Sequence, residues 1–159
     1  MKIREFTAAD QADITRLQDA FMAEFFPEFT SDPRQYQWNA DIYQIDASYL
    51  KNGGKFWVAE VNNDIVGFGG FRLLDTNCAE IKRLRIACAH RGKGLGTSII
   101  RHIESYCRAT KIKTITVDTD GRFEAAISMF TNLGYVFQRS ASATKNNIVY
   151  TDNYYEKLL

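Results

Sequence analysis

The chain is short of cysteine, of histidine and of long apolar runs, and each shortage excludes a class of protein. Its three cysteines, Cys78, Cys88 and Cys107, form no CxxC pair, and its two histidines lie too far apart for the usual zinc patterns. We therefore predict no disulfide framework, no metal site, and reduced thiols that are mostly structural. No run of about 18 apolar residues occurs, so we expect no membrane-spanning helix.

A charge excess is missing as well. Lysine and arginine outnumber the acidic residues by one, which leaves no overall positive field for a nucleic-acid backbone or an anionic membrane. The first residues are charged and too poor in apolar side chains for a signal peptide, so a cytoplasmic location is expected. The 159 residues are 45% apolar and 13% aromatic, which is typical of a soluble globular protein, and we predict one domain over residues 1–159.

Hydrophobic spacing in the first third of the chain predicts one strand followed by two helices. Residues 2–6 alternate apolar and charged side chains, and Thr7 with Asp10 resembles a capping box that opens the first helix. After a turn through Pro33, apolar residues recur at helical spacing over 38–49, which predicts the second helix.

The remaining two thirds of the chain predict six strands, with two helices among them. The first three form an antiparallel meander of β-prone runs joined by polar turns. We place the strands at 56–61, 65–73, 80–86, 113–118, 135–141 and 148–158, the helices at 95–110 and 123–133, and polar turns at 62–64 and 142–147. Gly134 follows the last helix, where a left-handed helix terminator belongs.

A candidate anion site lies between the meander and the helix that follows it, in Arg91, Gly92, Lys93, Gly94, Leu95, Gly96 and Thr97. Glycine lets backbone amides point into a turn, and the first amides of a helix are unpaired and carry its positive end. With two basic side chains beside them, these amides could bind a phosphate or a pyrophosphate. The glycines alone would fit a tight connection equally well. Their order matches neither the nucleotide P-loop nor the dinucleotide fingerprint GxGxxG.

Sequence features on both sides of this segment form a recognisable set. Glu80 opens the charged strand EIKRLRI, and Arg91, Gly94 and Gly96 fit the pattern R/Q-x-x-G-x-G/A. Leu-Gly-Tyr closes the last helix at 133–135. In these features the chain resembles the Gcn5-related N-acetyltransferase (GNAT) superfamily, over nearly its whole length. The resemblance implies an α/β fold with one central, mostly antiparallel sheet flanked by helices, in the order β-α-α-β-β-β-α-β-α-β-β.

The resemblance also implies acetyl-CoA as the acyl donor. It assigns the pyrophosphate of coenzyme A to backbone amides in the segment 91–97, and the pantetheine arm to exposed backbone of Leu84, Arg85 and Ile86, like an added strand. Neighbouring strands should splay apart to make room for the thioester. The implied reaction is acetyl transfer to a primary amine of a small molecule by direct attack in a ternary complex.

Glu80 is the candidate general base. An alkyl amine with a pKa of about 10.4 is mostly protonated at pH 7, and reaching its neutral form costs about 4.6 kcal/mol, so a group must take the proton. Glu80 matches a glutamate that many relatives place on this strand, where it can act directly or through water. The alternative is a solvated carboxylate, or an ion pair with Lys82 or Arg83. Direct attack requires no nucleophile, so Cys88 is expected to be structural.

Two phenylalanines mark a departure from the family. Relatives often carry an asparagine at the start of the last core helix and a tyrosine seven residues later that protonates the departing thiolate, whereas this chain has Phe123 and Phe130. We predict that both contact the coenzyme and that Phe130 packs beside its sulfur. Phenylalanine donates no proton, so either another tyrosine replaces the acid or the thiolate needs none. The tyrosines available are Tyr135, Tyr154 and Tyr155, although aromatic residues at strand spacing are more often core.

The acceptor pocket is expected between the first two helices and the last hairpin. This region carries the aromatic residues Phe21, Phe25, Phe26, Phe29, Tyr36, Trp38 and Tyr43 and the acidic residues Glu24, Glu28 and Asp32. Much of the aromatic density is ordinary core, but acids beside aromatic rings would suit a cationic amine through charge and cation–π attraction. We therefore expect a small polar amine as the acceptor.

Other functions stay open at this point. The replacements at 123 and 130 would fit a non-catalytic acyl-CoA-binding module. Acetylation of protein N-termini or lysines would need an open groove in place of a closed pocket. A nucleotide-binding module is disfavoured, because no lysine followed by serine or threonine closes the glycine segment. Pairing of two copies through the last hairpin, which occurs among relatives, is also open.

Overall fold

The centre of the fold is one seven-stranded sheet with the strand order β1-β2-β3-β4-β5-β7-β6. The computed structural model describes residues 1–29, 36–145 and 148–159. The strands are β1 (Lys2–Glu5), β2 (Lys55–Val61), β3 (Asp64–Leu73), β4 (Cys78–Ile86), β5 (Thr114–Asp120), β6 (Val136–Lys145) and β7 (Ile148–Leu158). Neighbouring strands are antiparallel except β4 and β5, which run parallel.

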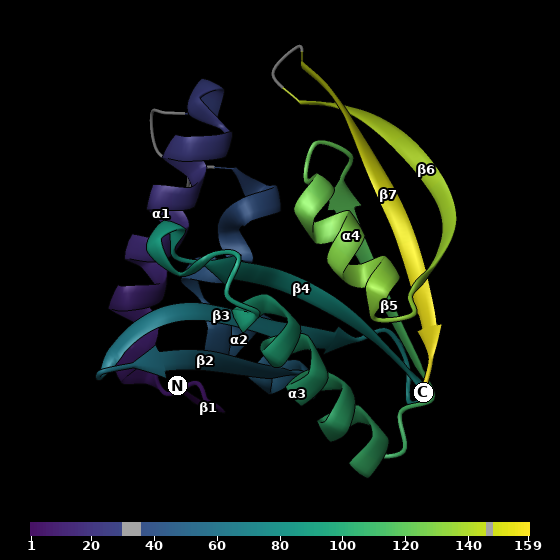
Figure 1. Ribbon diagram of the computed structural model, residues 1–159, viewed down its shortest axis with the longest axis horizontal. Helices are drawn as coiled ribbons and strands as arrows, with labels where there is room; N and C mark the ends of the chain where they lie inside the picture. The colour runs from purple at the N-terminus through teal and green to yellow at the C-terminus, as the bar shows by residue number, and fades with distance from the viewer. Residues whose placement is uncertain (30–35, 146–147) are drawn as a thin grey trace.

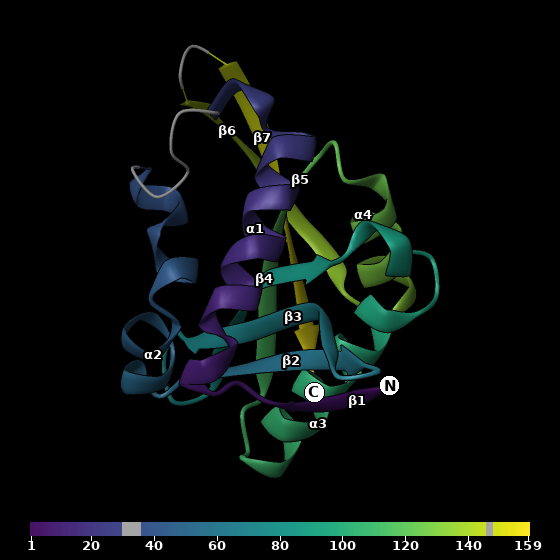
Figure 2. The ribbon, with the colours of Figure 1, turned by 90° about the vertical axis from the view of Figure 1, so that its left-hand side faces the viewer.

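Helices cover both faces of this sheet. They are α1 (Gln11–Phe25), α2 (Ile45–Ser48), α3 (Leu95–Ala109) and α4 (Glu124–Asn132), with short 3₁₀ segments η1 (Ala8–Asp10), η2 (Pro27–Phe29), η4 (Gln37–Tyr43), η5 (Leu50–Asn52) and η6 (Cys88–His90). Figures 1 and 2 show α1 and α2 on one face of the sheet and α3 and α4 on the other. Two apolar layers result, one around Ile99 and Ile103 of α3 and one around Ile14 of α1.

The order of elements predicted from the sequence is confirmed, as is the mostly antiparallel sheet flanked by helices. Local signals explain several boundaries. The carboxylate of Asp10 accepts hydrogen bonds from the Thr7 amide at 2.7 Å and the Thr7 hydroxyl at 3.0 Å, so the capping box holds the turn before α1. Asn62 and Asn63 have φ of 52° and 69°, as a two-residue hairpin turn requires. Gly134 ends α4 with φ of 86°.

The second predicted helix is wrong as one continuous element. The chain forms the 3₁₀ segment η4 and the single turn α2 instead, although Ile42, Ile45 and Tyr49 are buried as the spacing predicted. The physical reason is a tertiary contact. The guanidinium of Arg83 donates to the carbonyl oxygen of Trp38, which an α-helix would use for its own ladder, and holds the carboxylate of Asp41.

The last hairpin is longer than predicted. Its first strand, β6, extends to Lys145, four residues beyond the predicted end at 141, because Ser142, Ala143 and Thr144 pair with β7. The two asparagines at the end of the predicted turn lie outside the described residues, as do Asp32 and Pro33.

The central strands separate after a short parallel pairing. Pairing of β4 with β5 covers only the four positions from Cys78 to Ile81, opposite Thr114 to Val117. Beyond it, Lys82 pairs with Gly70 of β3 but Arg85 pairs with Phe68, so β4 has one residue more than β3 and forms a bulge. Arg83 lies in this bulge with a positive φ of 59°. The expected splaying of neighbouring strands is therefore present, and it begins at this bulge.

Within the described ranges, no helix is long and apolar enough to cross a membrane. Nor do three or more His, Cys, Asp or Glu side chains gather there in a way that could hold a metal ion. Cys107 is buried, Cys78 is half-buried, and Cys88 is exposed on η6, so burial does not support the structural role expected of Cys88.

Candidate active site

A cleft of about 980 Å³ opens where β4 and β5 separate. Its walls come from β4, β5, α4, η4, the end of α1, and the start of α3 with the loop before it, together with two residues of β7 and one each of η2 and β3. Among the predicted site residues, those that line the cleft are Leu84, Arg85, Ile86, Arg91, Gly92, Gly94, Leu95, Gly96, Thr97, Phe123 and Phe130. Glu80 and Lys93 are not part of the lining.

The glycine segment forms an open cradle at one end of the cleft. Gly92 and Gly94 have φ of 71° and 79°. Apart from their chain neighbours, no heavy atom of the described residues lies within 4 Å of the position that a Cβ would take at either one. Among the described residues, the first backbone hydrogen bond of α3 is donated by the Ser98 amide to the Gly94 carbonyl oxygen, at 3.0 Å. The amides ahead of it are the first amides of a helix, which have no carbonyl partner within the helix itself. This arrangement fits a phosphate or a pyrophosphate.

The third glycine of the segment has a different role. A Cβ at Gly96 would lie 3.2 Å from the sulfur of Met129 on α4 and 3.7 Å from a methyl group of Leu84. The absence of a side chain therefore lets α3 pack closely against α4 and β4, at the base of the cradle. From the sequence, all three glycines were expected to expose backbone amides. In the structure Gly92 and Gly94 are open, whereas Gly96 allows close packing.

Arg91 fixes the cradle to its surroundings. Its guanidinium donates to both carboxylate oxygens of Glu24 at 2.6 and 2.8 Å and to the carbonyl oxygen of Ile86 at 3.0 Å. These hydrogen bonds from Arg91 hold the pKa of the Glu24 carboxyl below its usual value. Lys93 is exposed and donates to the carbonyl oxygen of Ala89 at 2.9 Å. The loop between β4 and α3 is thus tied to α1 and to the end of β4.

The side chains of β4 divide the cleft into two sides. Leu84 and Ile86 point toward α3, since both come within 4.0 Å of the Cβ position at Gly96. Arg83 and Arg85 point the other way, toward η4 and α1, where they contact Asp41 and Gln18. After the roles that the resemblance implies, we call the side of the 91–97 segment the donor side and the side of Arg83 and Arg85 the acceptor side.

Charged residues of the acceptor side form a chain of ion pairs. Glu80 binds Arg72 at 2.9 Å and Lys82 at 3.0 Å, and Lys82 binds Asp118 of β5 at 2.5 Å. Burial lowers the pKa of the Lys82 amine, but the carboxylates of Asp118 and Glu80 outweigh that effect and raise it. The structure therefore contains the alternative ion pair between Glu80 and Lys82. Of the two carboxylates that bind Lys82, Asp118 lines the cleft and Glu80 does not.

A match to a family model decides the family of this protein. The acetyltransferase (GNAT) family model matches residues 14–135, which is most of the chain. The chain belongs to the GNAT acetyltransferase family. An acetyltransferase of this family from Staphylococcus aureus has a closely similar fold, with a TM-score of 0.81, 21% identity and 99% of this chain and 98% of that one covered.

Curated relatives agree with the GNAT assignment. The probable N-acetyltransferase family 8 member 5 of Mus musculus is 27% identical over 69% of this chain and 49% of its own length. The uncharacterised N-acetyltransferase YjgM of Escherichia coli is 24% identical over 84% of this chain and 80% of its own length. This GNAT chain spans about half the length of the first relatives that it matches.

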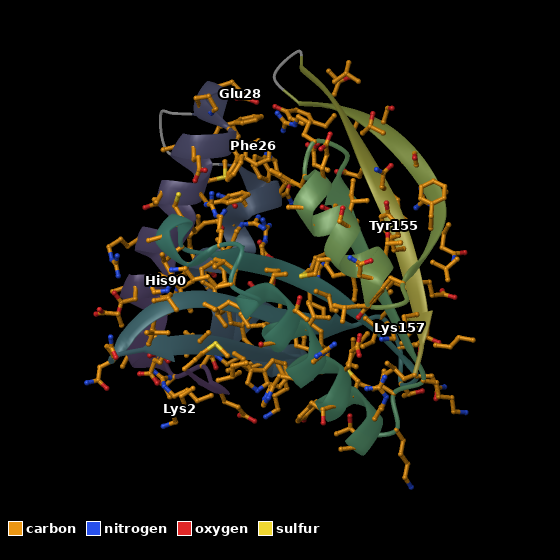
Figure 3. The ribbon with its side chains drawn as sticks, in the orientation of Figure 1. Lys2, Phe26, Glu28, His90, Tyr155 and Lys157 are labelled. Atoms are coloured by element: carbon orange, nitrogen blue, oxygen red, sulfur yellow. The ribbon has the colours of Figure 1, made fainter. Side chains whose placement is uncertain are left out.

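The two phenylalanines of this GNAT protein lie at different depths of the cleft. The ring of Phe123 packs against those of Phe21, Phe25 and Phe26 at 5.8, 5.3 and 6.0 Å, which joins α4 to α1. Figure 3 shows Phe26 at the end of α1, on the side toward α4. Phe130 is 3% exposed and lies deeper, edge-on to the ring of Tyr135 at 5.3 Å.

The tyrosines predicted as replacement acids lie outside the cleft lining, which contains Tyr150 instead. The Tyr150 hydroxyl donates to Glu28 at 2.5 Å, and burial together with this bond raises the pKa of Tyr150 to about 12. Neither Glu24 nor Glu28 lines the cleft, and both carboxylates accept hydrogen bonds from neighbours. Of the residues that suggested a cationic acceptor, only Asp32 has no described position. The carboxylates that line the cleft beside the aromatic rings are others, among them Asp118 and Asp120, and the small polar amine stays a prediction.

Proposed function

We propose that this GNAT protein transfers the acetyl group of acetyl-CoA to a primary amine of a small molecule, by direct attack in a ternary complex. The observation that carries the proposal is the continuity of the cleft. The open cradle at Gly92 and Gly94 leads directly to β4 residues that no longer pair with β5. Two structural neighbours support the donor: yncA of Salmonella typhimurium, solved with its cofactor acetyl-CoA, and a phosphinothricin acetyltransferase of Sinorhizobium meliloti, solved with AcCoA.

In this proposal the donor is bound mainly by backbone. The amides from Gly92 to Thr97 would bind the pyrophosphate, and the free edge of β4 at Leu84, Arg85 and Ile86 would pair with the pantetheine arm. A strand rises about 3.3 Å per residue, so an arm that runs back along β4 from the cradle ends near the bulge at Arg83. Acetyl-CoA supplies a thioester carbonyl that an amine can attack, and the protein would hold the two reactants together.

Glu80 is the proposed base for the acceptor amine. Because Glu80 does not line the cleft, it would take the proton through water. Lys82 lies between Glu80 and Asp118 and binds both carboxylates. Asp118 lines the cleft and is the second candidate for the same role. Phe130 is proposed to pack beside the coenzyme sulfur, which leaves the thiolate to depart without a protein acid.

The alternatives make different use of the same cleft. A non-catalytic module would bind acetyl-CoA without turnover, and a peptide or protein acetyltransferase would accept a lysine side chain or an N-terminus in place of a free amine. The relative named N-acetylaspartate synthetase, from Danio rerio, is 26% identical over 61% of this chain. Its name supports a small-molecule amine. A cytoplasmic location and pairing of two copies stay predictions.

The test is a transfer assay with purified protein. Acetyl-CoA is incubated with fractionated cell metabolites and with short peptides, and release of free coenzyme A is followed together with new acetylated masses. Acceptor-dependent release with an acetylated small molecule is the expected result. Acetylation confined to peptides would favour the protein acetyltransferase. Binding of acetyl-CoA, measured by calorimetry, without release in any fraction would favour the binding module.

A further inference from the structure

Among the residues that the structure describes, one cation of the cleft, Arg85, has no carboxylate partner. The other lysine and arginine side chains of the lining have carboxylate partners: Arg72–Glu80 at 2.9 Å, Lys82–Asp118 at 2.5 Å, Arg83–Asp41 at 2.5 Å, Arg91–Glu24 at 2.6 Å and Arg122–Asp120 at 2.9 Å. Within residues 1–29, 36–145 and 148–159, no carboxylate oxygen lies within 4.0 Å of the Arg85 guanidinium. Since every neighbouring cation is neutralised by the fold, Arg85 is the position at which the cleft itself is left positive.

Neutral groups hold the Arg85 side chain in place. Its Nη1 donates to the Leu84 carbonyl oxygen at 2.9 Å, and its Nε donates to Oε1 of Gln18 at 3.3 Å. The guanidinium lies over the ring of Phe21 at 3.8 Å from the ring centre. A guanidinium has five N–H groups in a rigid fork. These contacts orient the fork and leave N–H groups for a further acceptor, which is the arrangement that suits a planar anion such as a carboxylate.

The charge of Arg85 is poorly compensated where it lies. Burial, together with the nearby positive charge of Arg83, lowers the pKa of the Arg85 guanidinium to about 9. The group stays charged near pH 7, but that charge is costly without a partner. An anion bound at this point would remove the cost, so the site favours a negatively charged ligand over a neutral one of the same shape.

The position of Arg85 assigns this anion to the acceptor. Arg85 follows the bulge of β4 closely, and its side chain leaves the strand on the face of α1, opposite to Leu84 and Ile86. The cradle for the donor's phosphates lies beyond the end of β4, where Gly92 and Gly94 supply amides. A carboxylate at Arg85 would therefore sit beside the acyl end of the donor and away from its pyrophosphate.

We propose that the acceptor amine carries a carboxylate that binds the guanidinium of Arg85, so that this protein acetylates amino acids or closely similar amino carboxylates. This inference rests on the proposed acetyl transfer. The same side of the cleft is lined by the rings of Phe21, Phe26, Phe29 and Trp38. These rings favour an apolar side chain on the amino acid, since burying it against them removes apolar surface from water.

The experiment compares acceptors that differ only in the carboxylate. Free L-leucine is paired with isoamylamine, and free L-phenylalanine with phenethylamine, and kcat/KM is measured for each with saturating acetyl-CoA. The wild-type protein is expected to prefer the amino acid of each pair by at least about tenfold, as the loss of a charged hydrogen bond worth about 1.5–3 kcal/mol implies. In Arg85→Gln the preference should fall by at least about tenfold through a loss on the amino acid alone.

Two controls separate the explanations. Arg122→Gln removes another cleft arginine, one that has its own carboxylate, and it should change both acceptors of a pair by the same factor. Binding of acetyl-CoA to Arg85→Gln, measured by calorimetry, should match the wild type, because only the backbone of residue 85 is proposed to pair with the pantetheine arm. Unchanged binding also shows that the variant is folded. Weaker acetyl-CoA binding in this variant would assign Arg85 to the donor and overturn the proposal.

The remaining outcomes tell the two levels of inference apart. If amines are acetylated but the amino acid and the decarboxylated amine react equally in the wild type, the anion site is wrong and the acetyltransferase stands. An equal loss on both acceptors in Arg85→Gln would likewise contradict it. If no amine of any kind is acetylated, the proposed function itself fails.

Discussion

The donor side and the acceptor side of the cleft are built in different ways. The donor side is formed mainly by one stretch of chain, from Leu84 to Thr97, through its backbone and the edge of β4, with Phe130 of α4 beside it. The acceptor side consists of side chains from α1, η4, β4, β5 and β7, which lie far apart in the sequence. The two sides share β4, whose alternate side chains point in opposite directions.

The geometry of a backbone site is fixed by local conformation, whereas that of a side-chain site is fixed by the partners of each side chain. A backbone site needs only that Gly92 and Gly94 take a positive φ and that a helix begins after them. A side-chain site needs each charge to meet a particular partner, as Arg83 meets Asp41 and Lys82 meets Asp118. If the proposed roles are right, single side chains should change acceptor specificity while donor binding stays the same.

The strongest test of this separation is Glu80→Gln. If Glu80 removes the proton of the acceptor amine, the variant should lose about a hundredfold in kcat, the lower end of the range for general base catalysis, while the Kd for acetyl-CoA is unchanged. Steady-state kinetics and calorimetry measure the two quantities. Glu60→Gln is the matched control, because Glu60 is a strand glutamate that binds Arg4 at 2.8 Å away from the cleft.

Asp118→Asn decides between the two carboxylates of the ion-pair chain. A full rate in Glu80→Gln together with a hundredfold loss in Asp118→Asn would assign the base to Asp118. A loss of acetyl-CoA binding in either variant would instead contradict the division into donor and acceptor sides.

Gly94→Ala is expected to have a smaller effect, and to weaken donor binding where Glu80→Gln lowers the rate. An L-residue in the left-handed region costs about 1–2 kcal/mol, and the segment can relieve this strain by turning its amides out of the cradle. We expect the KM for acetyl-CoA to rise about tenfold while the KM of the acceptor is unchanged. Gly134→Ala is the control, since Gly134 also has a positive φ, of 86°, but lies at the far end of α4.

The two glycine variants should lose similar amounts of stability in thermal unfolding. Only Gly94→Ala should affect the donor. If Gly134→Ala weakens acetyl-CoA binding as much as Gly94→Ala does, then loss of stability explains both results. The conformation of Gly94 would then have no specific role in binding acetyl-CoA.

Local patterns were sufficient for most of the fold. The amphipathic spacing of α3, the asparagine turn at 62–63 and the terminator at Gly134 each depend on neighbours within a few residues, and each is present where it was predicted. The second helix could not be predicted in the same way. Arg83 takes the carbonyl oxygen of Trp38 from 45 residues away, and no local spacing contains that contact.

The same distinction applies to the site. The cradle was found because glycines have a local conformational meaning, although their division into open and packing positions needed the neighbour Met129 of α4. The role of the Arg85 side chain was missed, because its significance lies in the carboxylates that bind every other arginine and lysine of the cleft. The pairing of Arg91 with Glu24 spans 67 residues and had no signal in the sequence. Charges are visible in a sequence, but their partners are not.

The smallest effect is expected for Phe130→Tyr, which restores the tyrosine that relatives often carry. A coenzyme thiol has a pKa of about 8.5, as for cysteine, so its thiolate departs readily and needs no acid at pH 7. We expect kcat to stay within about threefold of the wild type and the Kd for acetyl-CoA within about twofold. The ring of Phe130 is buried against Tyr135, so thermal unfolding should accompany the kinetics to detect strain from the added hydroxyl. A gain of tenfold or more in kcat would show that the missing proton donor limits the reaction. A crystal structure with coenzyme A that places this ring far from the sulfur would remove Phe130 from the donor side altogether.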